Sequence, residues 1–210
     1  MDDADFRSPR DERRQAILAI AREVFMEEGY AAASMSAIAA RLGGSKGTLY
    51  NYFRSKEALF AAMVGDQSAQ KQAELFQLDD EVDDVADVLT RLGRRVVRLM
   101  LSEEVLCMHR IVVAESGRFP EIGEALYEAG PKRGKAPLIN YLNRAIKDGR
   151  LKPADPERMA GHAIELALSG LYRRRLWNVG PPPTEAEIDE NVDAAIEVFM
   201  AAYGVPAATS

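Results

Sequence analysis

The chain has 210 residues, of which 47% are hydrophobic and 29% charged, so it can bury a sizeable core beneath a charged surface. Its one cysteine excludes an intrachain disulfide and a cysteine metal cluster. No apolar run is long enough to span a bilayer, and the acidic N-terminus is unlike a secretion signal. We therefore expect a cytoplasmic protein with no membrane partner.

The net charge of −6 does not by itself exclude a nucleic-acid partner, because the placement of charge matters more than its sum. Between Gly29 and Lys56 the chain has four basic residues and no acidic one, whereas residues 66–210 have an excess of acids. A local basic patch on an acidic protein is a plausible arrangement for a selective DNA binder.

Helical periodicity predominates and strand signals are scarce, which predicts an all-α fold of about nine helices. The first helix is expected at about residues 9–28, with Gly29 as its C-cap. Ser34 is expected to cap a short second helix that ends at Gly43–Gly44. Ser45 then caps a short third helix, and Ser55 precedes a fourth that starts at Lys56 and continues to about residue 77 as a connector.

Longer helices are predicted after a boundary at residues 78–80. Gly180–Pro183 breaks the helical pattern, and Thr184 with Glu187 forms a capping box that starts the last helix. We expect residues 1–60 to form a DNA-binding domain and residues 78–210 to form a helical dimerisation and effector-binding domain. The helices are placed near 82–100, 103–117, 120–148 (straight, or bent at Gly130–Pro131), 156–178 and 184–203.

Two short helices joined by a glycine turn are typical of a helix-turn-helix. With the apolar residues of the third helix packed inward, its polar residues face outward, where the major groove of DNA presents base edges. Hydroxyls and helix N-termini at Ser34 and Ser45, with the charge of Lys56, suit phosphates. The outward set is Lys46, Gly47, Thr48, Asn51 and Tyr52, with the Tyr50 hydroxyl within reach.

Residues 12–60 resemble the TetR (TetR/AcrR) family of bacterial repressors. The resemblance rests on Ile38–Ala39, Gly43, Ser45–Tyr50, Tyr52–Phe53 and Ser55–Leu59. One departure is Gly44, where the family usually has valine, so a buried side chain is lost from the turn.

The resemblance implies a role for each matching position. Lys46, Gly47 and Tyr50 fall where members contact bases or the groove, and Ser36 falls where some members touch a base. The phosphate-contacting positions are Ser34, Thr48, Asn51, Tyr52 and Lys56. The basic N-terminal residues, Arg7, Arg10, Arg13 and Arg14, form either an arm that reaches DNA or a solvated tail.

The C-terminal part resembles the AefR-like subtype of this family. The similar segments are Glu115–Glu121, Tyr127–Pro131 and Arg175–Trp177. The resemblance implies that the last two helices pair with their twofold mates in a homodimer. The alternative is that the small residues of the first of these helices, Ala160, Ala163, Ala167 and Gly170, are buried within one subunit.

Several residues of the C-terminal part are candidates for contact with an apolar small molecule, with core packing as the alternative for each. Two nearby residues, His162 and Glu165, are too few for a metal site, and Cys107 is expected to be an inert thiol, so we predict no metal and no cofactor. The ligand candidates are Met100, Met108, His109, Phe119, Tyr127, Tyr172 and Trp177.

These patterns predict a TetR-like repressor that binds a palindromic double-stranded operator as a dimer and is released by a small-molecule effector. The alternative is a DNA-binding regulator with no small-molecule ligand, controlled by a protein partner. No phosphate-binding glycine loop, nucleophile elbow or metal triad is found in the sequence, so no enzyme is predicted.

Overall fold

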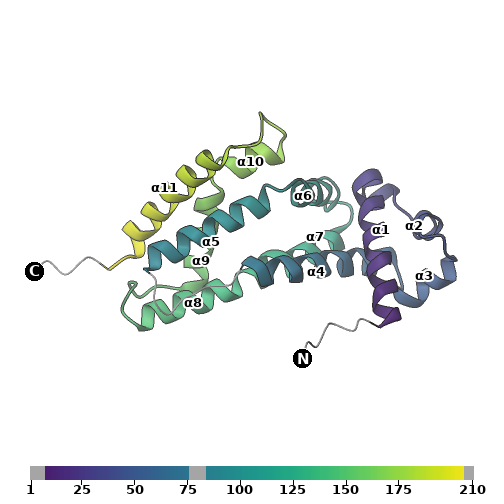
Figure 1. Ribbon diagram of the computed structural model, residues 1–210, viewed down its shortest axis with the longest axis horizontal. Coiled ribbons are helices and arrows are strands. Elements are labelled where there is room, and N and C mark those ends of the chain that lie inside the picture. Colours follow the sequence, from purple (N-terminus) through teal and green to yellow (C-terminus); the bar gives the residue numbers. More distant parts are fainter. Residues whose placement is uncertain (1–7, 76–83, 206–210) are drawn as a thin grey trace, which may run out of the picture. The chain divides into compact units, whose positions relative to one another are not determined.

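The computed structural model describes residues 8–75 and 84–205, which form α-helices joined by short connections (Figure 1). Within these residues the chain divides into two compact units. Unit 1 comprises the chain up to Ala69 together with Arg110–Gly130, and unit 2 comprises Gln70–His109 and Pro131–Ser210. The boundary predicted at residues 78–80 lies outside the described residues. No pattern in the sequence indicated that residues 110–130 join the N-terminal unit.

Unit 1 contains α1 (Pro9–Ala32), α2 (Met35–Arg41), α3 (Lys46–Tyr52) and the first part of α4 (Lys56–Leu75). It also contains the last part of α6 (Glu103–Glu115) and α7 (Pro120–Tyr127). The short helices α2 and α3 lie beside α1 in Figure 1 and contact each other. Because seven residues are too few to hold a helix in water, α2 and α3 depend on this packing.

An aromatic cluster forms the centre of unit 1. The ring of Tyr30 lies 5.7 Å from that of Phe25, 5.2 Å from that of Phe60 and 5.2 Å from that of Phe119. The first three side chains are fully buried. Phe119 precedes α7, so this contact joins residues 110–130 to the N-terminal helices and explains why both belong to one unit.

The break predicted at Gly29 is present, but the chain resumes a helical turn after it and α1 ends at Ala32. Gly29 has φ 77° and ψ 168°, a conformation that is essentially restricted to glycine. Its position is also crowded, since a Cβ there would lie 2.9 Å from Glu115 Oε1.

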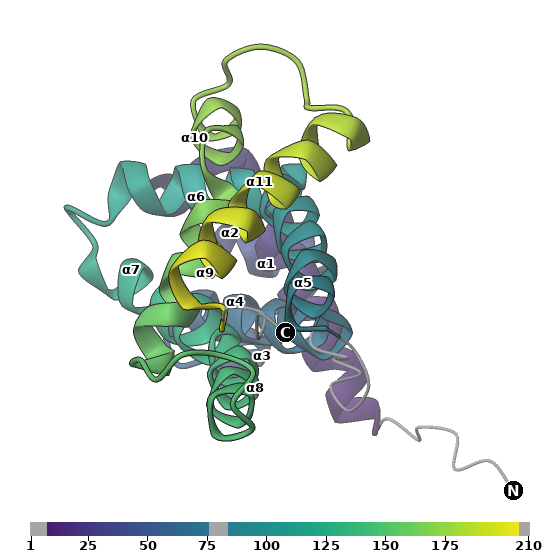
Figure 2. The same ribbon diagram turned by 90° about the vertical axis from the view of Figure 1, so that its left-hand side faces the viewer.

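Unit 2 contains α5 (Val85–Met100), α8 (Ala136–Lys147), α9 (Pro156–Leu168), α10 (Leu171–Leu176) and α11 (Glu185–Tyr203). Figure 2 shows α11 crossing α9 and running beside α5, and the same helices share one apolar core. The approach of α11 to α5 is close at Gly93, where a Cβ would lie 2.9 Å from Val192 Cγ1.

One helix that was expected to be continuous is divided, and another is interrupted at the bend that was its alternative. The predicted helix 156–178 is interrupted at Ser169–Gly170, where Gly170 has φ 77°, so α9 and α10 are separate. The predicted helix 120–148 consists of α7, a π-helical turn η1 (Glu128–Lys132) and α8, with Pro131 inside the turn. Proline removes a backbone donor, which explains the irregular turn at the expected bend.

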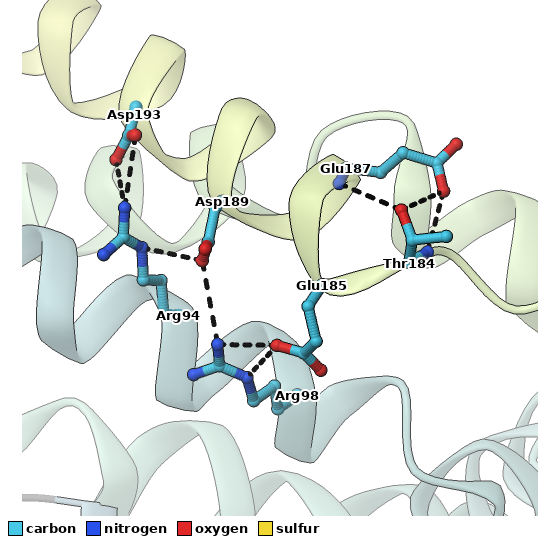
Figure 3. Close-up of polar contacts among 7 residues, drawn as sticks. All are labelled: Arg94, Arg98, Thr184, Glu185, Glu187, Asp189 and Asp193. Carbon is cyan, nitrogen blue, oxygen red and sulfur yellow. Dashed lines mark hydrogen bonds and ion pairs between the residues drawn. The ribbon is translucent and has the colours of Figure 1, made fainter.

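Ion pairs fix the position of α11 against α5 (Figure 3). Arg94 contacts Asp189 and Asp193 at 2.9 Å each, and Arg98 contacts Glu185 at 2.6 Å. Thr184 and Glu187 form the predicted capping box at the start of α11. Because these side chains are partly exposed, each pair contributes at most about 1 kcal/mol, so the pairs orient two helices that the apolar core holds together.

Replacing Gly29 with alanine should lower the free energy of unfolding by about 2–3 kcal/mol, since the new Cβ is strained and meets Glu115. Urea denaturation measures the change. The control is Gly65→Ala in α4, where the added Cβ has no described atom within 4 Å and alanine favours the helix, so stability should rise by up to about 1 kcal/mol. Equal tolerance of both substitutions would contradict the strain at Gly29.

Candidate nucleic-acid interface

The segment α2–turn–α3 is built by hydroxyl caps and one glycine turn. Ser34 Oγ accepts the amide of Ala37 at 3.1 Å, and Ser45 Oγ accepts the amide of Thr48 at 3.1 Å. Gly43 has φ 67°, which lets the chain reverse between the two helices. The caps predicted at Ser34 and Ser45 are therefore both present.

Packing of α3 leaves one face outward, as its sequence predicted. Leu49 is fully buried and Phe53, which follows α3, is 5% exposed. Lys46, Gly47 and Asn51 are exposed, as are Ser34, Ser36 and Ser45, while Thr48 and Tyr52 are partly covered. The candidate DNA-contacting set thus lies mainly on exposed parts of α2 and α3.

Tyr50 and Lys46 are neighbours one turn apart on this face. The Tyr50 side chain is 43% exposed, and the amine of Lys46 lies 6.0 Å from the centre of its ring. This contact is weak at an exposed site, but it places a cation and a phenol side by side on the exposed face of α3. Both side chains are therefore available to a groove.

Two of the four basic residues between Gly29 and Lys56 are engaged within the unit. Arg41 forms an ion pair with Glu27 at 2.7 Å. Lys56, predicted as a phosphate contact, directs its amine at the carbonyl oxygens of Tyr30 at 2.6 Å and Ala33 at 3.1 Å. Lys46 and Arg54 remain exposed, so the outward basic patch is smaller than the sequence suggests.

Arg13 packs onto the turn of the motif. A Cβ at Gly44 would lie 3.3 Å from Arg13 Nη2, so this guanidinium lies beside the position that valine usually occupies in the family. Arg10, Arg13 and Arg14 belong to α1 rather than to an extended arm, while Arg7 lies outside the described residues. Arg14 also lies 5.7 Å from the centre of the Phe53 ring, which ties α1 to the end of α3.

The candidate ligand residues do not gather in one unit. Phe119 and Tyr127 belong to unit 1, where Phe119 packs on Tyr30 and Tyr127 is 58% exposed. The others belong to unit 2, and among them Met108 is buried whereas Trp177 is 69% exposed.

His109 and Tyr172 are the two candidates that the structure brings into contact. His109 Nδ1 lies 2.6 Å from the Tyr172 hydroxyl, with the rings edge to face. Burial lowers the pKa of His109 below its usual 6.5 and raises the pKa of Tyr172, so both groups are neutral near neutral pH. Sequence reasoning selected both residues singly but had no signal for their pairing across 63 positions.

Sequence reasoning missed Glu115 as a member of the DNA-binding unit. Its carboxylate accepts hydrogen bonds from the amides of Tyr30 at 2.8 Å and Ala31 at 2.6 Å, in the last turn of α1. No local pattern joins residues 84 or 85 positions apart, so a single sequence contains no signal for this contact.

The described residues contain no grouping of three or more His, Cys, Asp or Glu side chains suited to a metal ion. No helix among them has both the length and the apolar character needed to cross a bilayer.

A two-helix motif with an outward polar face on the second helix defines the class: a helix-turn-helix DNA-binding protein. The family model "Bacterial regulatory proteins, tetR family" matches residues 17–63, and the model "AefR-like transcriptional repressor, C-terminal domain" matches residues 87–205. The second match covers more than half of the chain. The chain therefore belongs to the TetR family of transcriptional regulators, with an AefR-like C-terminal domain.

Individual relatives agree with this assignment. The transcriptional repressor AcnR of Corynebacterium diphtheriae is 35% identical over 165 residues, which cover 77% of this chain and 80% of AcnR. A TetR-family regulator from Mesorhizobium loti has a TM-score of 0.84 at 28% identity, covering 95% of this chain and all of that one. The flavonoid-responsive regulator FrrA has a TM-score of 0.81 at 29% identity, covering 93% and 99%.

The neutral state of the partly buried His109 predicts a pH effect on stability. The pKa of His109 is lower in the folded chain than in the unfolded chain. Below about pH 6.5 the folded chain therefore binds fewer protons than the unfolded chain does. The free energy of unfolding should therefore fall as the pH drops through this range, and His109→Asn should remove that part of the dependence. Urea denaturation from about pH 7.5 to about pH 5 measures both proteins. Identical pH profiles would show that burial of His109 has no effect.

Proposed function

We propose that the chain is a repressor that binds a palindromic operator as a homodimer, with one helix-turn-helix in each half-site. The observation that supports this most is the exposed face of α3 with Lys46, Tyr50 and Asn51, which has the donors and acceptors that major-groove base edges recognise. The relative AcnR is named as a repressor, which favours repression. Bound at a promoter in the bacterial cytoplasm, the dimer would block RNA polymerase.

We divide the candidate residues by role. Lys46, Gly47, Tyr50 and Ser36 read bases or the groove, and Ser34, Ser45, Thr48, Asn51 and Tyr52 hold the sugar–phosphate backbone. The amine of Lys56 donates to backbone carbonyl oxygens at the end of α1. We therefore propose that Lys56 supports DNA binding mainly by holding this turn in place, and that any phosphate contact is secondary.

We propose dimerisation through the C-terminal helices. Val198 on α11 is 55% exposed, and the exposed Ala194 and Ala201 flank it on the same face of the helix. A stripe of small apolar residues suits close crossing with a second copy, and a single motif makes too few contacts for a specific site. The outward side of α11 is the proposed interface.

We propose a small-molecule effector that binds unit 2 and favours a conformation unable to engage both half-sites. FrrA is named for its response to flavonoids, which supports an apolar or aromatic effector. The contact candidates in unit 2 are Met100, Met108, His109, Tyr172 and Trp177. Phe119 and Tyr127 remain weaker candidates because they belong to unit 1. The rival proposal is a ligand-free regulator controlled by a protein partner.

Lys46→Ala should weaken binding to operator DNA about tenfold, because it removes a base-contacting cation. Fluorescence anisotropy with labelled DNA flanking the protein's own gene measures the affinity at several salt concentrations. The matched control is Lys147→Ala, which removes an exposed lysine from α8 of unit 2 and should change affinity little. Equal affinity of both lysine variants would contradict the assignment of α3.

A panel of aromatic compounds, added to the complex of the wild-type protein with its operator, separates the effector proposal from its rival. Release of the DNA by a compound supports an effector, and no release by any compound favours control by a protein partner.

Val198→Asp should convert the dimer to a monomer and lower operator affinity at least tenfold, because it places a charge in an apolar helix crossing. Sedimentation velocity measures the assembly state. Val113→Asp, at a valine that is 70% exposed on α6, is the control and should leave the dimer intact. A dimeric Val198→Asp protein would place the interface elsewhere.

A further inference from the structure

The last part of α1, which leads to α2, has an unusual backbone. Gly29, with its positive φ, interrupts α1, and only a short turn, Tyr30–Ala33, separates it from Ser34, the N-cap of α2. A helical turn that starts after a break has amide groups with no acceptor inside the helix. These amides need acceptors from elsewhere in the unit.

Glu115 supplies them from the end of α6. Its Oε1 accepts the amide of Tyr30 at 2.8 Å, and its Oε2 accepts the amide of Ala31 at 2.6 Å. Each carboxylate oxygen thus binds one amide at the positive end of the turn, which makes both hydrogen bonds charge-assisted. Gly29 allows this approach, since a Cβ there would lie 2.9 Å from Oε1.

The carbonyl oxygens of the same turn are bound by a cation. Lys56 Nζ donates to the carbonyl oxygens of Tyr30 and Ala33, and it lies 4.3 Å from the centre of the Tyr30 ring. The Tyr30 hydroxyl lies 3.4 Å from Glu121 Oε1. Burial and the nearby carboxylates of Glu57 and Glu121 raise the pKa of Tyr30, so the hydroxyl stays protonated and donates. The carboxylate of Glu115 therefore accepts from the amides of this turn, and the ammonium of Lys56 donates to its carbonyl oxygens.

We propose that Glu115 is a positioning residue for DNA recognition, which fixes the turn that sets α2 and therefore α3 on α1. The proposal rests on the proposed function, because it assigns a role in binding the operator. All of the residues involved belong to unit 1. Glu115 does not touch DNA in this account, but acts through the amides of Tyr30 and Ala31.

The sign of the expected effect separates this role from simple electrostatics. Removing a negative charge from a DNA-binding unit strengthens binding to phosphate. Loss of the carboxylate cap loosens α2 and α3 and weakens binding to the operator. A weaker operator complex after neutralisation of Glu115 is thus opposite to the charge effect.

The experiment compares Glu115→Gln with Glu124→Gln, which neutralises an exposed acid of α7 in the same unit. Amide hydrogen exchange by NMR should accelerate about tenfold at Tyr30 and Ala31 in Glu115→Gln, while the amide of Ala86, capped by Asp84 in unit 2, stays unchanged. Operator affinity should fall roughly threefold to tenfold in Glu115→Gln, with the salt dependence unaltered, and should stay equal or rise in Glu124→Gln. Glu115→Ala, which removes both acceptors, should have the larger effect on both measurements.

Unchanged exchange at Tyr30 and Ala31 would overturn the proposal, as would faster exchange at all slowly exchanging amides together, which indicates global unfolding. Local acceleration with unaltered operator affinity would also overturn it. A wild-type chain that binds no DNA would refute the proposed function, and exchange at the two amides would then still report whether Glu115 holds the turn.

Discussion

The arrangement of unit 1 depends on one constraint: α2 and α3 are too short to be stable alone. Each has seven residues, and a helix of that length in water is held only by its neighbours. Ser34 and Ser45 satisfy the first free amides, Leu49 and Phe53 are buried in the unit, and the Tyr30 cluster forms the centre of its core. The orientation of the DNA-facing side chains is thus a property of the whole unit.

The same constraint explains why residues far apart in the chain join one unit. Phe119 completes the aromatic cluster, and Glu115 caps the turn that leads to α2. The N-terminal helices therefore require residues 110–130 for their packing. A fragment ending at residue 60, the boundary expected from the sequence, would lack both contacts.

Local features of this fold were predictable because their causes are local. Hydroxyl caps at Ser34 and Ser45, the break at Gly29 and the capping box at Thr184 all follow from a few adjacent residues. The outward face of α3 followed from its apolar positions. The division of the helix expected at 156–178 was missed, because a glycine inside an apolar periodic pattern is compatible with a continuous helix and only the observed φ of Gly170 reveals the break.

Contacts between distant segments could not be predicted from one sequence. Lys56 was expected at phosphate because it is basic and begins a helix, yet its amine donates to carbonyl oxygens at the end of α1. The pairing of His109 with Tyr172 and the capping by Glu115 are likewise set by tertiary packing. In unit 2 the apolar side chains form the core, as their pattern predicted. Residues that would contact an apolar effector are of the same types, so the pattern alone cannot distinguish them from core residues.

The central claim is that two copies of α3 read two half-sites related by symmetry. Selection of bound duplexes from a random-sequence pool by the full-length protein, followed by sequencing, tests it most directly. The account predicts an enriched motif of two inverted half-sites whose centres lie about one helical turn of DNA, or a multiple of it, apart. A pool with no enriched motif, or one with a single unsymmetrical site, would contradict the account.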